Sequence, residues 1–186
     1  MTEWERKMDM RKLLLVIDMQ KDFVDGSLGT PEAEKIVPNV VRKIESYPEE
    51  NVIATRDTHG EDYLKTQEGQ KLPVIHCVQG TPGWELVPPV AQALGKARIV
   101  DKPTFGSVAL AKELAELARR EPIALELVGL CTDICVVSNA LLLKAAMPEV
   151  PISVDASCCA GVTEELHRAA LSVMGSCQIG ILHGDA

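Results

Sequence analysis

A cysteine stands where a strand-like segment passes into a helical one. Residues 123–128 are mostly apolar, as in a buried strand, and apolar residues from Ile134 to Ala145 recur at helical spacing. Cys135 is therefore expected in the first turn of that helix, where unpaired backbone N–H groups and the helix dipole favour negative charge. This environment can lower the pKa of a thiol from about 8.5, and the resulting thiolate attacks carbonyl carbon. Packing is the alternative role, because cysteine is among the residue types most often buried.

Two other strand-like segments end in charged residues. Residues 13–17 run directly into Asp18, and residues 98–100 run into an Asp–Lys pair that ends at Lys102. In an open parallel sheet, ligands bind beyond the carboxyl ends of the strands, so Asp18 and Lys102 could meet Cys135 in one pocket. A carboxylate there can take the thiol proton, and an ammonium group favours both charged forms. The alternative is that charged residues simply follow buried strands where the chain reaches water.

A second set of residues is typical of metal ligands. Asp57 and His59 lie two apart after the strand-like residues 52–55, and His76 follows in a loop that contains proline. Side chains at i and i+2 of an extended segment point to the same side, so Asp57 and His59 could bind one ion together. A polar surface turn would give the same pattern.

Strand-like and helical segments alternate along the chain. Such alternation requires right-handed crossovers and a sheet covered on both faces. We therefore expect an α/β fold of three layers, α-β-α, with a mainly parallel six-stranded sheet of Rossmann-like topology. Three local features are expected in addition: helices that begin at Thr30 and Thr163, a Cys158–Cys159 pair after the fifth strand, and a last strand that begins at Cys177.

Length and composition predict one domain over residues 1–186. The chain is 46% hydrophobic, and no repeat or Ser/Gly-rich linker divides it. The connection over residues 58–97 is too long for a plain loop, which predicts a functional insertion with some local structure.

Charge and hydropathy argue against several partners. Lys and Arg number 19 against 27 Asp and Glu, and the net charge of −8 without a basic stripe argues against nucleic acid. No run of 18 apolar residues suggests a membrane span, and Met1–Asp9 lacks the apolar core of a signal peptide. We therefore expect a cytoplasmic protein whose six cysteines remain thiols.

Several stretches of the chain resemble those of the isochorismatase-like cysteine hydrolases, and within them most of all the nicotinamidases. The matching stretches, in family order, are Val16–Phe23, Thr55–His59, His76–Thr81, Asp101–Lys102 and Gly129–Val136, with Asp155–Ala156 and His167–Leu171 extending the match. The resemblance implies the isochorismatase-like fold and a catalytic triad of Asp18, Lys102 and Cys135. Cys135 would be the nucleophile, Asp18 the general base, and Lys102 would hold the charge balance of the pair.

The resemblance also implies how the negative charge that develops on the carbonyl oxygen would be stabilised. A cis peptide bond between Leu130 and Cys131 is expected to direct the backbone N–H groups of Cys131 and Cys135 at the developing oxyanion. These two N–H groups would form the oxyanion hole.

A divalent metal ion is implied as well. Nicotinamidases hold one through an Asp, a His and a second His at this spacing, which correspond to Asp57, His59 and His76. The ion receives the pyridine nitrogen of the substrate. Glu68 is placed to add a carboxylate, with Glu61 and Asp62 as competitors. Zinc is the favoured ion, and iron and manganese are alternatives for mixed oxygen and nitrogen ligands.

One departure from the family concerns the substrate ring. Nicotinamidases usually carry an aromatic residue three positions before the second metal histidine, and Pro73 stands there. Phe23 matches the aromatic residue after the catalytic Asp, and Phe105 could supply another wall, whereas Trp84 is expected in loop packing.

The resemblance implies hydrolysis of nicotinamide to nicotinate and ammonia through a thioester on the cysteine. The alternatives are hydrolysis of another small amide or carbamoyl compound, and a member that binds a small molecule without catalysis. The family further implies a homo-oligomer.

Overall fold

The structure of the chain, a computed structural model, describes residues 10–184. Six strands form one sheet, in which every paired strand is parallel and the order is β3-β2-β1-β4-β5-β6. The strands are β1 (Arg11–Ile17), β2 (Val52–Asp57), β3 (Arg98–Lys102), β4 (Ile123–Leu130), β5 (Ile152–Ala160) and β6 (Gly180–Leu182). The expected sheet is confirmed, and it is parallel throughout.

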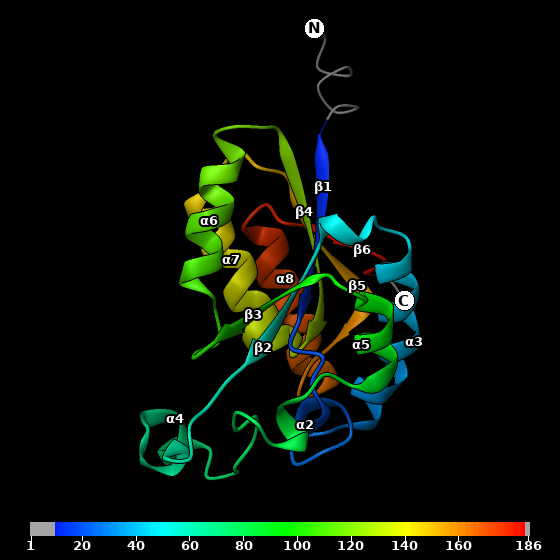
Figure 1. The fold of residues 1–186 in the computed structure, drawn as a ribbon. Coiled ribbons are helices and arrows are strands. Elements are labelled where there is room, and N and C mark those ends of the chain that lie inside the picture. The colour runs from blue at the N-terminus through cyan, green and yellow to red at the C-terminus, as the bar shows by residue number, and fades with distance from the viewer. Residues whose placement is uncertain (1–9, 185–186) are drawn as a thin grey trace, which may run out of the picture.

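Helices cover both faces of this sheet. The α-helices are α2 (Lys21–Val24), α3 (Pro31–Glu45), α4 (Gln67–Lys71), α5 (Pro88–Leu94), α6 (Val108–Ala118), α7 (Val137–Ala146) and α8 (Glu164–Ser176). Short 3-10 turns lie at η1 (Glu49–Asn51), η2 (Tyr63–Lys65) and η3 (Pro82–Trp84), and a π-helical turn, η4 (Thr132–Val136), precedes α7. Figure 1 shows α6, α7 and α8 on one face and α3 and α5 on the other.

Alternation of side chains along β1 explains the two covered faces. Leu13, Leu15 and Ile17 pack into the apolar cluster beneath α6, α7 and α8. Leu14 and Val16 pack into the cluster beneath α2, α3 and α5. A strand that is apolar on both sides is typical of the centre of a parallel sheet.

Helix starts agree with the sequence, whereas two strand boundaries do not. Thr30 Oγ1 accepts a hydrogen bond from Ala33 N, and Thr163 Oγ1 accepts one from Leu166 N, which confirms both N-caps. The Cys158–Cys159 pair lies inside β5 rather than after it. A register shift between β4 and β5 prolongs their pairing, so that Cys159 still pairs with Gly129.

The predicted start of the last strand at Cys177 is wrong. The N–H group of Cys177 donates to the carbonyl groups of Val173 and Met174, so this residue ends α8. Gln178 then takes a positive φ of 66°, and the strand begins only at Gly180.

The strand order places a crevice at one end of the sheet. The chain moves from β1 outward to β2 and β3, and then crosses back to lay β4 on the other side of β1. Such a reversal of strand order leaves an opening beyond the carboxyl ends of the central strands. In Figure 1 these ends point downward, toward the projecting segment that carries α4.

The long connection between β2 and β3 has local structure, as expected. It contains η2, α4, η3 and α5. No helix among residues 10–184 is both long and apolar enough to cross a membrane. The segment Met1–Asp9, which the sequence suggested is no signal peptide, lies outside the described residues.

Candidate active site

The carboxyl ends of β1, β3 and β4 bring Asp18, Lys102 and Cys135 together. Asp18 directly follows β1, Lys102 ends β3, and Cys135 lies in the π-helical turn after β4. Lys102 Nζ is 2.6 Å from Asp18 Oδ2 and 3.6 Å from Cys135 Sγ. The side chains of Asp18 and Lys102 are fully buried. The structure therefore places the expected carboxylate, ammonium and thiol in one cluster.

The two oxygens of Asp18 have different partners. Thr55 Oγ1 donates a hydrogen bond of 2.6 Å to Asp18 Oδ1. Asp18 Oδ2 lies close to Lys102 Nζ, but the approach lacks hydrogen-bond geometry. Among the buried side-chain oxygen and nitrogen atoms of residues 10–184, Oδ2 is one of two without a hydrogen-bond partner. The nearest charged group to this oxygen is the ammonium group of Lys102, at 2.6 Å.

The pKa of Cys135 differs from the sequence-based expectation. Burial raises the pKa of the thiol well above its ordinary value, the charge of Asp18 raises it further, and Lys102 opposes both. Burial also raises the pKa of Asp18, against the lowering effect of Lys102. The expectation that a helix end lowers the pKa of Cys135 is wrong, because full burial outweighs it. The thiol thus keeps its proton until a base removes it.

Lys102 remains charged between its partners. Burial by itself would lower the pKa of Lys102, but the charges of Asp18, Cys135 and Asp57 raise it above its ordinary value. Its Nζ also donates to the carbonyl oxygen of Thr104 at 3.1 Å. This buried ammonium group is consequently surrounded by acceptors.

The peptide bond between Leu130 and Cys131 is cis, as the resemblance implied. Cys131 is the N-cap of the π-helical turn, and its side chain makes no capping hydrogen bond. Its carbonyl oxygen accepts hydrogen bonds from the backbone N–H groups of Ile134 and Val136, both at 3.0 Å. The turn that carries Cys135 is therefore anchored on Cys131.

A second cluster gathers four side chains from β2 and the segment after it. Asp57 ends β2, His59 follows it, Glu68 lies in α4, and His76 lies beyond α4. One potential ligand atom of each residue lies within 4.8 Å of those of the other three, and this is the only such group found among the described residues. His76 Nε2 is 3.7 Å from both Asp57 Oδ2 and Glu68 Oε1. Glu61 and Asp62 do not join the group.

The cluster fits a divalent metal ion. His59 Nε2 lies 2.9 Å from Asp57 Oδ2 yet is the other buried atom of the described residues without a hydrogen-bond partner. His76 Nδ1 is hydrogen-bonded to the carbonyl oxygen of Val74 at 2.8 Å, which leaves Nε2 directed at the cluster. Two imidazole nitrogens and two carboxylates are a donor set that suits zinc, iron or manganese.

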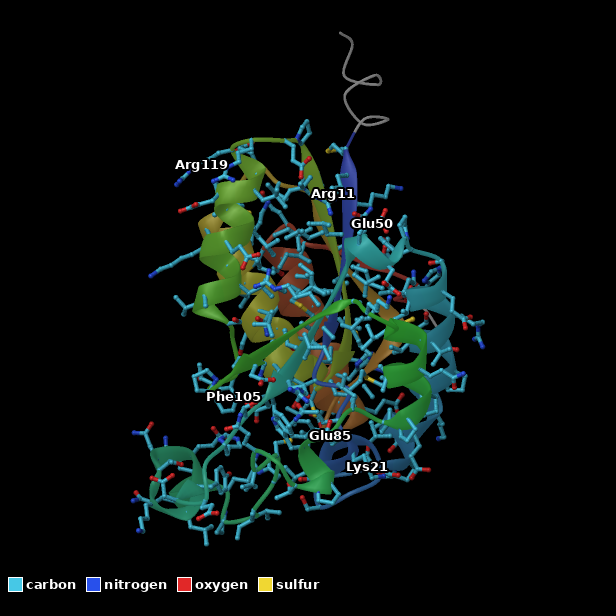
Figure 2. The ribbon with its side chains drawn as sticks, in the orientation of Figure 1. Arg11, Lys21, Glu50, Glu85, Phe105 and Arg119 are labelled. Atoms are coloured by element: carbon cyan, nitrogen blue, oxygen red, sulfur yellow. The ribbon has the colours of Figure 1, made fainter. Side chains whose placement is uncertain are left out.

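Both clusters open on one cavity of about 710 Å³. Its lining includes Cys135 and Cys131, all four members of the second cluster, and both phenylalanines. Phe23 packs at 5.5 Å from the ring of His76. Phe105 is 40% exposed, and Figure 2 shows it at the end of the sheet that faces the α4 segment. The two expected walls therefore lie where a substrate could touch them.

The residue at the usual aromatic position does not line the cavity. Leu72 lines it in place of its neighbour Pro73. Trp84 is also absent from the lining. Its Nε1 donates to Thr58 Oγ1 at 2.8 Å, and the guanidinium group of Arg56 lies 3.5 Å from its ring centroid. Trp84 therefore packs the loop, as expected.

Sequence reasoning missed the residues that support the two clusters. Besides Thr55, the buried Gln20 grips the backbone of Asp57. Gln20 Nε2 donates to the Asp57 carbonyl oxygen at 2.8 Å, and Gln20 Oε1 accepts from the Asp57 N–H group at 2.7 Å. Tyr63 packs against the rings of His59 and His76, at 4.7 and 4.9 Å. Gln20 and Thr55 lie in stretches that resemble the family, and this was the signal available for them.

Comparisons with known proteins agree with this fold. A family model described as the isochorismatase domain matches residues 12–182. A pyrazinamidase of Pyrococcus horikoshii, solved in complex with zinc, is 30% identical, with a TM-score of 0.76 over 92% of this chain and 98% of that one. A nicotinamidase/pyrazinamidase of Bacillus subtilis is 28% identical, with a TM-score of 0.79 over 94% of this chain and 100% of that one.

A more distant structure shares the fold. An N-carbamoylsarcosine amidase from Thermoplasma acidophilum is 22% identical, with a TM-score of 0.73 over 95% of this chain and 98% of that one. The search of curated protein sequences gave no significant match.

An open parallel sheet covered by helices on both faces, with a buried thiol, carboxylate and ammonium group at its crevice, is the arrangement of a three-layer α/β protein with a candidate cysteine nucleophile. Within that class, this chain belongs to the isochorismatase family of hydrolases, because the family model covers nearly all of it.

Proposed function

We propose that this protein is a cysteine amidohydrolase that converts nicotinamide and water to nicotinate and ammonia. The observation that carries the proposal is that the thiol of Cys135 and the cluster of Asp57, His59, Glu68 and His76 line the same cavity. The relatives named for nicotinamide or pyrazinamide hydrolysis support the choice of substrate. We further propose that residues 1–186 act as one domain.

The nucleophile and the base are Cys135 and Asp18. Cys135 Sγ attacks the amide carbonyl carbon while its proton passes to Asp18 Oδ2, which is ion-paired with Lys102 but accepts no hydrogen bond. The backbone N–H groups of Cys131 and Cys135 stabilise the negative charge that develops on the carbonyl oxygen. The carbon–nitrogen bond then breaks, Asp18 returns its proton to the leaving nitrogen, and ammonia departs from the thioester.

Water completes the cycle. Asp18 takes a proton from the attacking water, the bond between carbon and sulfur breaks, and Asp18 passes its proton to the departing sulfur, which restores the thiol and releases the acid product. Lys102 stays positively charged throughout, between Asp18 and Sγ, and offsets whichever of the two is negative.

The substrate ring would be oriented by the second cluster and the aromatic walls. Asp57, His59, Glu68 and His76 would hold a divalent ion, and such an ion supplies a Lewis-acid site for a pyridine nitrogen. Phe23 and Phe105 would flank the ring, because both line the cavity.

An ammonia assay tests the proposal. Purified protein with zinc and millimolar nicotinamide should release ammonia and nicotinate in equal amounts. Cys135→Ala should lower turnover by more than about a thousandfold, since removal of a nucleophile abolishes the covalent route. Cys177→Ala is the matched control, because Cys177 is exposed and should leave the rate unchanged. Absence of ammonia from the unaltered protein would defeat the assignment of nicotinamide.

A second candidate is another small amide or carbamoyl compound. The observation in its favour is that the cavity is lined by the aliphatic Leu72, next to the position where nicotinamidases usually carry an aromatic residue for the substrate ring. Ammonia release from such a compound, but not from nicotinamide, would select it. A protein whose Cys135 resists iodoacetamide and which hydrolyses neither class would instead be a small-molecule-binding member.

A further inference from the structure

Asn139 is a buried polar residue of α7 that lies one helical turn after Cys135. Only 2% of its surface is exposed. Its amide nitrogen Nδ2 donates to the carbonyl oxygen of Cys135 at 2.8 Å and to that of Phe105 at 3.0 Å. Its oxygen Oδ1 accepts from the backbone N–H group of Ser107 at 3.0 Å. One side chain thus joins the nucleophile's turn to the segment that carries Phe105.

That segment, residues 103–107, connects two parts of the active site. It follows Lys102 directly, and the carbonyl oxygen of Thr104 accepts a hydrogen bond from Lys102 Nζ. At its other end, Ser107 Oγ accepts from Leu110 N and caps α6. Asn139 therefore links the exit of β3 to the exit of β4, beyond the carboxyl ends of both strands.

The segment also lies directly on α7. A Cβ atom added at Gly106 would come within 3.3 Å of the carbonyl oxygen of Ser138 and 3.4 Å of Leu142 Cδ2. The ring of Phe105, by contrast, is 40% exposed, so side-chain packing restrains it only in part. The position of Phe105 consequently depends on its backbone, and Asn139 is the side chain that binds that backbone.

No other side chain of this size reproduces the three bonds. An amide has two donor hydrogens and an acceptor oxygen, whereas an ionised carboxylate only accepts and an aliphatic group does neither. Asn139→Asp would keep the shape and the acceptor for Ser107 but would lose both donated bonds.

We propose that Asn139 is a positioning residue, which holds the aromatic wall of Phe105 at a fixed separation from the thiol of Cys135. The inference rests on the proposed function for its substrate, but it assigns a role that can be measured without turnover. Asn139 would act on an aromatic substrate through Phe105 and would not itself touch the reacting atoms.

The experiment compares two alkylating agents on the same thiol. Iodoacetamide is small, and its N-phenyl derivative carries an aromatic ring that Phe105 can contact. The quantity compared is the alkylation rate of Cys135 by the N-phenyl derivative divided by its rate with iodoacetamide. This ratio cancels any change in the reactivity of the sulfur itself. In Asn139→Asp and in Phe105→Ala, this ratio should fall about three- to tenfold, the range expected for one aromatic contact.

Two further variants complete the design. Asn39→Asp is the matched control, because Asn39 Nδ2 likewise donates to a backbone carbonyl, that of Ser157 at 2.7 Å, but outside the cavity lining. Its ratio should stay within twofold of the unaltered protein. The double variant of Asn139 and Phe105 should match Phe105→Ala alone, since Asn139 acts through that ring. Should Asn139→Asp not fold, Asn139→Ser takes its place, because a single hydroxyl cannot donate to both carbonyl groups.

A lower melting temperature of Asn139→Asp with an unchanged ratio would overturn the proposal, since it would show a purely structural role. The proposal would also be overturned if the fall of the ratio in the double variant were the product of the falls in Asn139→Asp and Phe105→Ala, because the two residues would then act independently. With nicotinamide as substrate, KM should rise about tenfold or more in Asn139→Asp, because small misplacements are costly to an oriented substrate. If the unaltered protein releases no ammonia, the nicotinamide assignment fails, and the alkylation ratio still decides the role of Asn139.

Discussion

The hydroxyl group of Thr55 is one of the groups that favour the charged form of the proposed base. Burial raises the pKa of Asp18, and the hydrogen bond that Thr55 Oγ1 donates to its carboxylate opposes that rise. Thr55→Val keeps the shape but removes the donor, so the pKa of Asp18 should rise further. Because the ionised carboxylate is the base, the acid limb of kcat/KM against pH should move to higher pH.

The size of this effect follows from the kind of hydrogen bond. A hydrogen bond to a charged group contributes about 1.5–3 kcal/mol, so kcat/KM for nicotinamide should fall about tenfold or more at pH values on the acid limb. Thr81→Val is a suitable control, because the exposed Thr81 makes a similar bond to a carbonyl oxygen, that of Val78 at 2.7 Å. An acid limb that stays in place in Thr55→Val would contradict the role given to Asp18.

Among the elements, β4 lies unusually close to β1 at Gly129. This residue has a φ of 117° and pairs with Ile17, and an added Cβ atom would lie 2.1 Å from the Ile17 carbonyl oxygen. Both the backbone conformation and the contact oppose any side chain. Gly129→Ala should therefore lower the free energy of unfolding by about 2–4 kcal/mol, as measured by urea denaturation.

The contrasting substitution is Gly175→Ala in α8. There an added Cβ atom would meet nothing closer than Ile181 Cγ1 at 3.8 Å, and the residue is helical. Alanine loses less conformational entropy in a helix than glycine, so this variant should gain about 0.5–1 kcal/mol. Equal effects of the two substitutions would show that the close approach at Gly129 is not maintained in solution.

Some elements could be read from the sequence and others could not. Thr30 and Thr163 were predictable as helix starts, because an N-cap hydroxyl acts on its own next turn. The extent of β5 was not, since Cys158 and Cys159 are held in the strand by pairing with β4, which no local pattern reveals. The first turn after β4 is π-helical, whereas the helical spacing of the sequence predicted an α-helical turn there.

On the scale of the whole molecule, an ion-pair network joins the sheet to α3 and to the residues after β6. Lys43 Nζ is 2.7 Å from Asp155 Oδ2 and 2.6 Å from Glu126 Oε1, and His183 Nδ1 is 3.0 Å from Asp155 Oδ1. Burial by itself would raise the pKa of Asp155, but the hydrogen bonds from Lys43, Ser157 and His183 lower it to about 2.

A lowered pKa makes stability depend on acidity. A carboxylate with a depressed pKa stabilises the fold above its unfolded value of 3.8, and that contribution is lost as the pH falls toward about 2. Asp155→Asn should therefore cost about 2 kcal/mol at neutral pH, and the difference from the unaltered protein should shrink between about pH 4 and pH 2.

The exposed pair of Lys21 and Asp25 supplies the comparison for this measurement. Asp25→Asn should change the free energy of unfolding by less than about 1 kcal/mol at every pH, because solvent screens such pairs. A difference for Asp155→Asn that persists unchanged at pH 2 would contradict the assignment of a lowered pKa.

Across the molecule, the residues of the two clusters were easier to predict from the sequence than the buried polar residues that hold them in place. Asp18, Lys102 and Cys135 lie at or just after the carboxyl ends of strand-like segments. In a parallel sheet these ends lie at the same edge, so the sequence predicts that the three residues meet there. Glu68 was preferred over Glu61 and Asp62 from the family resemblance, and the placement of α4 brings Glu68 alone of the three into the group. Gln20, Thr55 and Asn139 act through contacts between distant segments, and the periodicity of a sequence does not indicate which polar side chains make them.

The four donor groups of the second cluster all fall between residue 57 and residue 76, whereas the thiol, the base and the ammonium group come from the ends of other strands. One contiguous stretch of the gene therefore encodes all four residues proposed to hold the metal ion, whereas the aromatic walls Phe23 and Phe105 and the reaction machinery are encoded elsewhere. Substitutions within this stretch could change the substrate specificity while Asp18, Lys102 and Cys135 are inherited unchanged. Exchange of the stretch between relatives is the corresponding engineering route.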